Sequence, residues 1–229
     1  MKKNLIITPT GHNSLYKDWL GENQNENSFD IIFLCYEDND FYKELNDLGF
    51  KAYKCKGEKW SIIKNFLLEN KNIIDSYDFF WFPDDDLKIT NEQINLFFQV
   101  NKDYDLWLSQ PSASGFTSHK VTNRKDDLKL RFTNFVEIMC PLMSKTCLTQ
   151  LIDSFEYSKS GWGLDFLWPK LLGYPRNKIA IIDLVNIIHT RPVGDEYGNR
   201  FLISPHEEMM ILMKQFDLHF NIVEYDYIK

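Results

Sequence analysis

Long apolar runs, paired cysteines and an excess of positive charge are all missing from this sequence of 229 residues. No stretch approaches the roughly 20 apolar residues that a membrane-spanning helix needs, and the apolar run at residues 5–7 is too short for the core of a signal peptide. We therefore expect a cytoplasmic protein. The four cysteines lie far apart with no CxxC pair, which predicts buried, reduced thiols and neither a zinc site nor disulfides: Cys35, Cys55, Cys140 and Cys147.

The charge balance narrows the range of partners. The chain carries 33 acidic and 26 basic residues, a net charge of −7. An acidic surface does not attract a phosphate polymer, so we expect no nucleic-acid partner. A small phosphate ligand is compatible with this balance, because a metal ion and one or two local cations suffice to bind it. No polybasic patch supports membrane docking, although a place at the inner membrane face is compatible with a soluble chain. The oligomeric state stays open.

Length and composition indicate a single domain over residues 1–229. Hydrophobic residues make up 44% and aromatic residues 15% of the chain, enough for a substantial core. In the N-terminal half, apolar runs alternate with helical patterns, which predicts an α/β fold with a mainly parallel central sheet flanked by helices. The expected elements are strands at residues 3–8, 29–36, 50–55 and 78–82, and helices at residues 41–48 and 58–70.

The second half of the chain is less regular. Its expected elements are a helix at residues 90–101, a strand at 105–109, a turn-rich loop at 111–115, an extended segment at 131–143, a helix at 144–155, and strands at 178–183 and 184–189. Near the end, Met209, Leu212, Met213 and Phe216 share one helical face. We therefore expect an amphipathic helix at residues 205–215 that packs on the domain, with a partner surface as the alternative.

An acidic triplet follows the most apolar of the expected strands. The strand at residues 78–82 ends at Pro83, and Asp84, Asp85 and Asp86 come next. Ligands of open α/β sheets bind outside the carboxyl ends of strands, and three adjacent carboxylates are unfavourable unless solvent or a cation compensates them. Asp84 and Asp86 point the same way in an extended segment, so they would hold Mg²⁺ or Mn²⁺ together with substrate phosphates. The alternative is a solvated loop whose acids cap the next helix.

Polar residues also follow the first expected strand. Gly11 permits a close backbone turn, and Thr10, His12 and Asn13 beside it are candidates for contact with a nucleotide base or ribose. A helix cap at Asn13 or Ser14 explains the same residues equally well.

A tryptophan between two glycines forms the next candidate. Gly161 and Gly163 would let the indole of Trp162 lie against a sugar, since sugars stack on aromatic faces. Asp165 follows at the expected start of an apolar helix, where a carboxylate is favoured. The alternative role of Asp165 is helix capping alone.

A histidine and an arginine end the last expected strand. A neutral imidazole at His189 is a plausible third metal ligand, and Arg191 would hold a diphosphate by a bidentate contact. A structural or simply exposed histidine is the alternative, and local sequence does not decide between these interpretations.

Taken in order, these blocks resemble a family of plant and bacterial proteins described as a domain of unknown function, and their layout is similar to that of GT-A glycosyltransferases. The blocks are GHNSL at residues 11–15, YDFFWFPDDDL at 77–87, RFTNFVEIMCP at 131–141, SGWGLDFLWP at 160–169 and IAIIDLVNIIHTRPVG at 179–194. The resemblance implies a GT-A-like fold and a metal site. Asp84 and Asp86 match the Asp-x-Asp motif that binds metal and the nucleotide diphosphate, with Asp85 between them. His189 matches the histidine that closes the metal site from a late strand.

The same resemblance implies an acceptor site. The segment around Trp162 and Gly163 is similar to the Gly-Trp-Gly-acid segment of galactosyltransferase-like enzymes, in which the acid contacts the acceptor and serves as base. Two acids often follow directly in those enzymes, whereas here Leu164 precedes the single Asp165.

Together these roles imply a metal-dependent glycosyltransferase that moves a sugar from a nucleotide-diphosphate donor to a hydroxyl of a glycan or lipid-linked glycan, with inversion if Asp165 is the base. Polysaccharide biosynthesis is the natural setting. A nucleotidyltransferase on a similar fold is one alternative, but it usually has a basic, Gly-rich loop after the first strand, and residues 9–14 contain no Lys or Arg. A non-catalytic carbohydrate-binding protein is the other.

Overall fold

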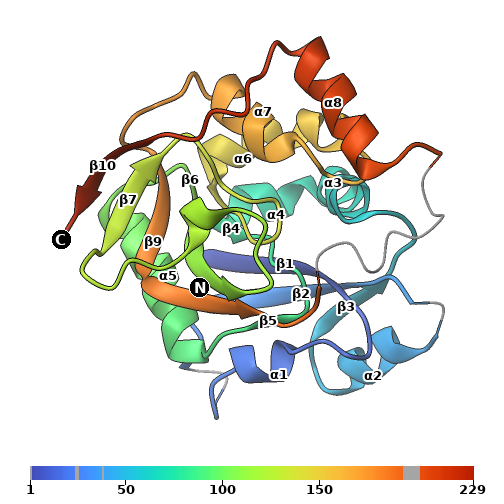
Figure 1. The fold of residues 1–229 in the computed structure, drawn as a ribbon. Helices are drawn as coiled ribbons and strands as arrows, with labels where there is room; N and C mark the ends of the chain where they lie inside the picture. The colour runs from blue at the N-terminus through green and yellow to red at the C-terminus, as the bar shows by residue number, and fades with distance from the viewer. Residues whose placement is uncertain (1, 24–25, 38, 193–201) are drawn as a thin grey trace.

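The computed structural model describes residues 2–23, 26–37, 39–192 and 202–229, so Val193 and Gly194 of the last motif lie outside the described residues. A ten-stranded sheet runs through the molecule with helices on both faces (Figure 1). The strands are β1 (Asn4–Thr10), β2 (Phe29–Cys35), β3 (Lys51–Lys54), β4 (Phe79–Trp81), β5 (Leu87–Lys88), β6 (Leu108–Gly115), β7 (Leu130–Thr133), β8 (Leu142–Ser144), β9 (Ile179–His189) and β10 (Glu224–Ile228). The helices are α1 (Tyr16–Trp19), α2 (Phe41–Asp47), α3 (Lys59–Glu69), α4 (Lys71–Ser76), α5 (Asn91–Asp103), α6 (Lys145–Leu151), α7 (Leu164–Leu171) and α8 (Pro205–Gln215), with 3₁₀ turns η2 (Lys120–Thr122) and η3 (Ile152–Glu156).

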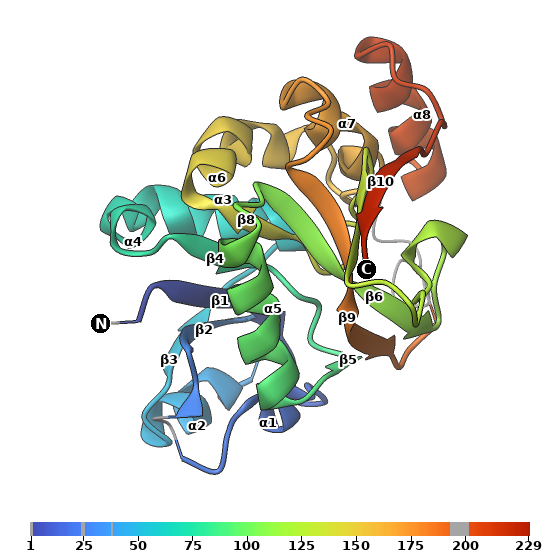
Figure 2. The same cartoon turned by 90° about the vertical axis from the view of Figure 1, so that its left-hand side faces the viewer.

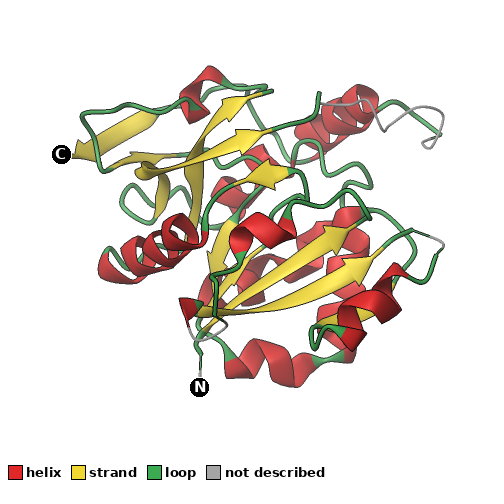
Figure 3. Ribbon diagram, turned by 90° about the horizontal axis from the view of Figure 1, so that it is seen from below, coloured by secondary structure: helices red, strands yellow, loops and turns green. Residues whose placement is uncertain are grey.

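The sheet is parallel around its first strand. Its order is β10-β7-β9-β6-β8-β4-β1-β2-β3, with β5 paired to β9. β1 pairs in parallel with β2 and β4, β2 with β3, and β6 with β9, while β8, β7 and β10 run antiparallel to their neighbours. Figure 3 shows the strands fanning out between the helices. The predicted α/β architecture, a mostly parallel central sheet flanked by helices, is confirmed.

Alternate residues of β1 divide the core into two layers. Leu5 and Ile7 face the cluster built with α3, α6 and α7, whereas Ile6 faces the cluster built with α1, α2 and α5. Figure 2 shows these two groups of helices on opposite sides of the sheet. The continuous apolar character of β1 and β4 follows from this, because both faces of these strands are buried.

The helix boundaries follow local signals in the sequence. Thr90 caps α5 in a reciprocal capping box with Gln93, and Ser204 caps α8 in the same way with Glu207. Gly49 adopts a positive φ of 88° just after α2, as expected of a residue that ends a helix. The helices expected at residues 41–48, 58–70, 90–101 and 205–215 are confirmed.

The interpretation of residues 111–115 as a loop is wrong. They continue β6, and the register against β9 shifts between Pro111 and Ser112. A proline has no N–H to give to the ladder, so it is tolerated where the pairing is irregular. The two strands expected at residues 178–183 and 184–189 are likewise one strand, β9. Both errors arise because turn-forming residues here occupy a bulge inside the sheet.

The extended segment expected at residues 131–143 is only partly strand. β7 ends at Thr133 and β8 begins at Leu142, and the residues between them cross one wall of the cavity described below. The antiparallel edge strand β10 was not expected. Its Glu224 accepts a hydrogen bond from Arg131 Nη1 at 2.8 Å, while Asp183 accepts from Arg131 Nε at 2.8 Å and Nη2 at 3.0 Å. Arg131 is fully buried, so this cluster ties β7, β9 and β10 together.

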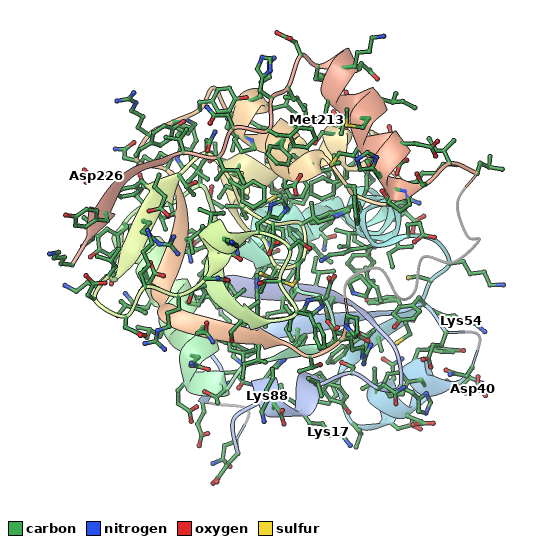
Figure 4. All side chains as sticks on the ribbon, in the orientation of Figure 1. Lys17, Asp40, Lys54, Lys88, Met213 and Asp226 are labelled. Carbon is green, nitrogen blue, oxygen red and sulfur yellow. The ribbon has the colours of Figure 1, made fainter. Side chains whose placement is uncertain are left out.

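The C-terminal helix α8 covers α7 and the cavity. Leu212 and Met213 are buried in the core cluster, and Met213, labelled in Figure 4, lies on the side of α8 that faces the rest of the molecule. This helix therefore packs on the core of the described molecule. In the part of the chain that the structure describes, no helix has the length and apolar character required to cross a membrane.

Candidate active site

A cavity of about 810 Å³ lies at the carboxyl ends of β1 and β4. Its walls come from the start of α3, the segments that follow β6 and precede β8, the start of α7, and the end of β9. This is the edge of the sheet at which α/β proteins bind ligands. Eight residues predicted from the sequence line it: Asp84, Asp85, Asp86, Trp162, Gly163, Asp165, His189 and Arg191.

The three acids of the triplet have three different partners. Asp84 Oδ1 lies 2.6 Å from Lys59 Nζ, and the same ammonium donates to the carbonyl oxygens of Ile138 at 2.9 Å and Met139 at 3.0 Å. Burial raises the pKa of Asp84, and the positive charge of Lys59 opposes that shift. Lys59 therefore supplies a cation inside the cavity wall, and its bonds to the two carbonyls hold the ammonium against Asp84.

Asp85 connects the triplet to the loop after β1. Its Oδ2 accepts the backbone N–H of Gly11 at 2.7 Å, and its Oδ1 lies 3.4 Å from Arg191 Nη1. Arg191 Nη2 in turn donates to the carbonyl of Asn13 at 2.6 Å. Burial raises the pKa of Asp85 to about 6, although the Gly11 N–H and Arg191 both favour the charged form. This network fixes the geometry of the loop and places the guanidinium of Arg191 at the cavity.

Asp86 faces His189, and the contact has an unusual chemical requirement. Asp86 Oδ2 lies 3.1 Å from His189 Nε2, and His189 Nδ1 lies 2.6 Å from the carbonyl oxygen of Phe116. Because a carbonyl can only accept, Nδ1 carries a hydrogen. In the neutral ring Nε2 would then turn its lone pair toward a carboxylate oxygen. The contact is favourable only if Nε2 carries a second proton or if a cation lies between the two atoms.

The electrostatics of the pair agree with that requirement. Both side chains are buried. Burial lowers the pKa of His189, but the hydrogen bond and negative charge of Asp86 outweigh it, so that the net shift is upward. The fixed Nδ1–H is also the arrangement by which proteins orient a histidine whose Nε2 binds a metal.

The predicted metal ligands Asp84, Asp86 and His189 do not form one cage. Among the residues that the structure describes, no group of three or more His, Cys, Asp or Glu side chains is placed to hold one ion. Asp84 is turned to Lys59, so the pair that fits an ion is Asp86 with His189. Two protein ligands suit Mg²⁺ or Mn²⁺, because such ions usually complete their shell with water and substrate phosphates.

The residues predicted to contact the nucleotide from the loop after β1 do not line the large cavity. Thr10 is fully buried, and its hydroxyl donates to the carbonyl of Thr8 at 2.9 Å, so it does not face a ligand. His12 lies 3.2 Å from Glu37 and against the ring of Phe41, beside a separate cavity of about 240 Å³. Gly11 and Asn13 act on the site through their backbone contacts with Asp85 and Arg191. The cavity wall here is Pro9 and Tyr36 instead.

The Gly-Trp-Gly segment is shaped by its neighbours. Gly161 and Gly163 have φ values of 84° and 91°, which favour glycine. A Cβ on Gly161 would lie 2.7 Å from the Trp60 ring, and one on Gly163 would lie 3.0 Å from Leu212 of α8. The two glycines thus allow close packing on either side while Trp162 stays half-buried in the cavity wall.

Asp165 lies in the first turn of α7, as predicted. It is buried at 7% exposure, and its Oδ1 accepts the backbone N–H of Phe166 at 3.1 Å. Burial raises the pKa of Asp165 to about 7, although backbone N–H groups of the helix start oppose the shift. A carboxyl that titrates near neutral pH beside a cavity is suited to accept a proton.

Glu208 of α8 fixes the segment that carries Trp162. Its carboxylate accepts from the backbone N–H of Lys159 at 2.7 Å and of Ser160 at 2.8 Å, and from the hydroxyls of Ser158 and Ser160 at 3.1 Å and 2.6 Å. These bonds explain a net lowering of the Glu208 pKa despite burial, which by itself raises it. The helix, whose Met209 lines the cavity, therefore sets the position of the segment that carries Trp162.

Two residues of the site were missed by the sequence reasoning. Glu137 lies in the irregular segment before β8 and lines the cavity, and burial raises its pKa to about 8. The available signal was a single acid inside an apolar run. Lys59 is the first residue of α3, where a positive charge is unfavourable for the helix dipole. That conflict was the signal that Lys59 has a partner elsewhere.

Solved structures of similar fold come from S. aureus TarS. The 1–349 fragment in complex with UDP-GlcNAc superposes with a TM-score of 0.58 at 12% identity, covering 93% of this chain and 65% of that one. The fragment in complex with UDP gives 0.52 at 12% identity, covering 93% and 70%. A longer TarS structure gives 0.54 at 14% identity, covering 93% and 42%. The chain thus spans about two-thirds of the first fragment. These likenesses confirm the predicted glycosyltransferase-like α/β fold.

The protein belongs to the family described as "Protein of unknown function (DUF707)", whose profile matches residues 18–196. The predicted resemblance to a family of unknown function is thereby confirmed at the level of the family. The matched residues include the acidic triplet, Asp165 and His189. No curated protein sequence matches the chain.

Proposed function

We propose that this protein is a glycosyltransferase that moves a sugar from a nucleoside-diphosphate donor to a hydroxyl group of a glycan or lipid-linked glycan. The observation that carries the proposal is that the Asp86–His189 pair and Asp165 line the same cavity. One end of this cavity suits a diphosphate with its counter-ion, and the other offers a base. The likeness to a fold crystallised with UDP-GlcNAc and UDP supports a uridine-linked donor.

The diphosphate end is formed by Asp86, His189 and Arg191. Asp86 and His189 are the residues that would hold Mg²⁺ or Mn²⁺, since their facing oxygen and nitrogen, 3.1 Å apart, need a cation or a proton between them. Such an ion, when bound, neutralises charge on a diphosphate. Arg191, whose side chain is 33% exposed and lies 3.4 Å from Asp85, lines the same cavity and adds a second positive charge.

The acceptor end is formed by Asp165 and Trp162. Asp165 accepts the proton of the acceptor hydroxyl while the hydroxyl oxygen bonds to the anomeric carbon of the donor. The bond from that carbon to the phosphate oxygen breaks, and the nucleoside diphosphate leaves with the bonding electron pair. Because the acceptor attacks from the face opposite the leaving group, the transfer inverts the anomeric centre. Trp162 supplies the apolar face on which an acceptor sugar rests.

A thermal-shift screen tests the proposal. The ligands are UDP, GDP, CDP and their common sugar conjugates, each with and without Mn²⁺, because a ligand that binds only the native state raises the melting temperature. We expect one nucleotide to raise it only in the presence of the metal, and the cognate nucleotide sugar to release free nucleoside diphosphate slowly with water as acceptor.

The matched pair of variants is Asp86→Ala and Asp78→Ala. Asp78 is exposed and lies at the opposite end of β4 from the acidic triplet. Asp86→Ala should abolish the metal-dependent shift and the release of nucleoside diphosphate, whereas Asp78→Ala should keep both. A wild-type protein that gives no shift with any ligand would indicate a different function. A shift without turnover for any acceptor would favour a binding protein.

A further inference from the structure

The carboxyl group of Glu137 is built into the cavity without a complete set of partners. Glu137 is only 6% exposed and lines the cavity. Its Oε2 is buried and has no hydrogen-bond partner within the described part of the chain. A buried polar atom left unpaired is costly, so its retention beside a ligand-sized cavity indicates that a ligand supplies the missing hydrogen bond.

The main chain at Glu137 is held by a buried glutamine. The backbone N–H of Glu137 is held by Gln110 Oε1 at 2.6 Å, and Gln110 Nε2 donates to the carbonyl of Pro111 at 3.1 Å. Gln110 is fully buried at the centre of β6. The main chain at Glu137 is thus anchored through another residue. The carboxyl accepts one hydrogen bond from the backbone of Ser118, which leaves Oε2 for a role in the cavity.

Glu137 lies between the two ends of the proposed site. The charges that act on it come from Asp165 on one side and from His189 and Asp84 on the other. Under the proposed function, the transferred sugar must span this interval, because its anomeric carbon lies between the diphosphate and the acceptor hydroxyl. A group in the middle of this interval therefore contacts the ring of the transferred sugar, and contacts neither the nucleotide nor the acceptor.

We propose that Glu137 forms a hydrogen bond with a hydroxyl group or another polar substituent on the ring of the transferred sugar. The orientation of that substituent would then select the donor sugar. This assignment rests on the proposed function and deepens it. Burial and the charge of Asp165 keep the pKa of Glu137 at about 8. At neutral pH the group is therefore mainly a neutral acid, which can both donate to and accept from a sugar hydroxyl.

Glu137→Ala and Glu137→Gln separate this role from a structural one. An amide keeps one donor and one acceptor near the original positions, whereas alanine removes both. The control is Glu69→Ala, because Glu69 is exposed at the end of α3 and does not line the cavity. The probes are UDP, UDP-glucose, UDP-galactose, UDP-GlcNAc and UDP-GalNAc with Mn²⁺, measured by calorimetry. If the thermal-shift screen selects GDP or CDP, that nucleotide and its sugar conjugates replace UDP and the UDP-sugars.

We expect Glu137→Ala to bind the free nucleoside diphosphate as the wild type does, and to lose about tenfold or more of its affinity for the preferred nucleotide sugar, the loss typical of one buried hydrogen bond. Its ranking of the sugars should also flatten. Glu137→Gln should keep most of the affinity, and Glu69→Ala should match the wild type. Equal losses for nucleotide and nucleotide sugar, or no loss for either, would overturn the assignment while leaving the proposed function intact. If the wild type binds no nucleotide, the proposed function fails, and this assignment fails with it.

Discussion

Two buried groups of charges differ in how completely they are paired. In the cluster of Arg131, Asp183 and Glu224, the guanidinium has hydrogen-bond partners at each of its nitrogens, including the carbonyls of Val121 and Asn123. In the cavity, Glu137 keeps an unpaired oxygen, and the contact between Asp86 and His189 requires an additional cation or proton. The first cluster is paired within the protein, whereas the second leaves some of its polar atoms without a protein partner.

The same contrast is visible in the protonation of the acids. Burial raises the pKa of Glu224, but Lys125 and Arg131 outweigh it and the net shift is downward. Burial raises the pKa of Asp165 to about 7 and that of Glu137 to about 8, with no comparable compensation. Glu224 is a partly exposed acid whose charge is compensated, and such an acid is a poor indicator of function by itself. A buried acid that the protein leaves uncompensated beside a cavity is a much better one.

Of all variants in the Arg131 cluster and the cavity, we expect the largest effect from a change in the cavity, and this effect is on the rate of catalysis. Asp165→Asn removes the proton acceptor with almost no change in shape, so we expect the transfer rate to fall about 10²–10⁴-fold, as for other general bases. Binding of the nucleotide with metal should stay close to that of the wild type. The control is Asp153→Asn, an exposed carboxylate on η3. A fully active Asp165→Asn variant would show that another group takes the proton.

The second-largest expected effect is a loss of folding stability when the Arg131 cluster is broken. Arg131→Met leaves Asp183 buried without its partner, and breaking a buried pair in this way costs about 3–5 kcal/mol of unfolding free energy. Arg124→Met, which breaks an exposed pair with Asp126, should cost less than about 1 kcal/mol. Urea unfolding measures both. If the two variants were equally stable, the buried cluster would not be the structural element that we infer.

The smallest effect is on the pH dependence of stability. Asp165 and Glu137 have raised pKa values in the folded state, so between about pH 4 and about pH 8 the native protein binds more protons than the unfolded chain. Their contribution to stability therefore decreases as pH rises. Glu224 has a lowered pKa, so its contribution is present at neutral pH and is lost as pH falls below its ordinary value of about 4.5.

The double variant Asp165→Asn, Glu137→Gln isolates the contribution of the cavity. Its unfolding free energy should change less between pH 5 and pH 8 than that of the wild type, and it should exceed the wild-type value most at the alkaline end. Urea titrations at several pH values measure this difference. Identical pH profiles would mean that the two acids are not held away from ionisation.

The sequence predicted the parts of the site that are contiguous in the chain. The acidic triplet after β4, the Gly-Trp-Gly segment with Asp165, and His189 with Arg191 all line the cavity. Each combines an apolar element with a polar residue at its end, which is a local pattern. The exception is the loop after β1, where Thr10 turns into the core and His12 turns to Glu37. A loop pattern shows that polar groups are present but does not fix which way they point.

The remaining features depend on contacts between distant residues. Lys59 reaches Asp84, Glu224 reaches Arg131, and Glu137 is positioned by Gln110. In each case the partner is far along the chain, and no spacing rule connects the two. The bulge at Pro111 was misread for a related reason, because its place in the sheet is set by pairing with β9. Local propensity describes an element, whereas its partners are a property of the whole fold.

The contact between Lys59 and Asp84 has a consequence for how the family evolves. Lys59 has its three hydrogens on Asp84 and on two main-chain carbonyls. Losing the lysine leaves the Asp84 carboxylate in the cavity wall without its cation, and losing the aspartate leaves the part-buried ammonium with only carbonyls as partners. Neither single change is neutral, so substitutions at positions 59 and 84 should occur together across the relatives of this chain. A lineage that has exchanged both would carry a different charge pattern in this wall of its cavity.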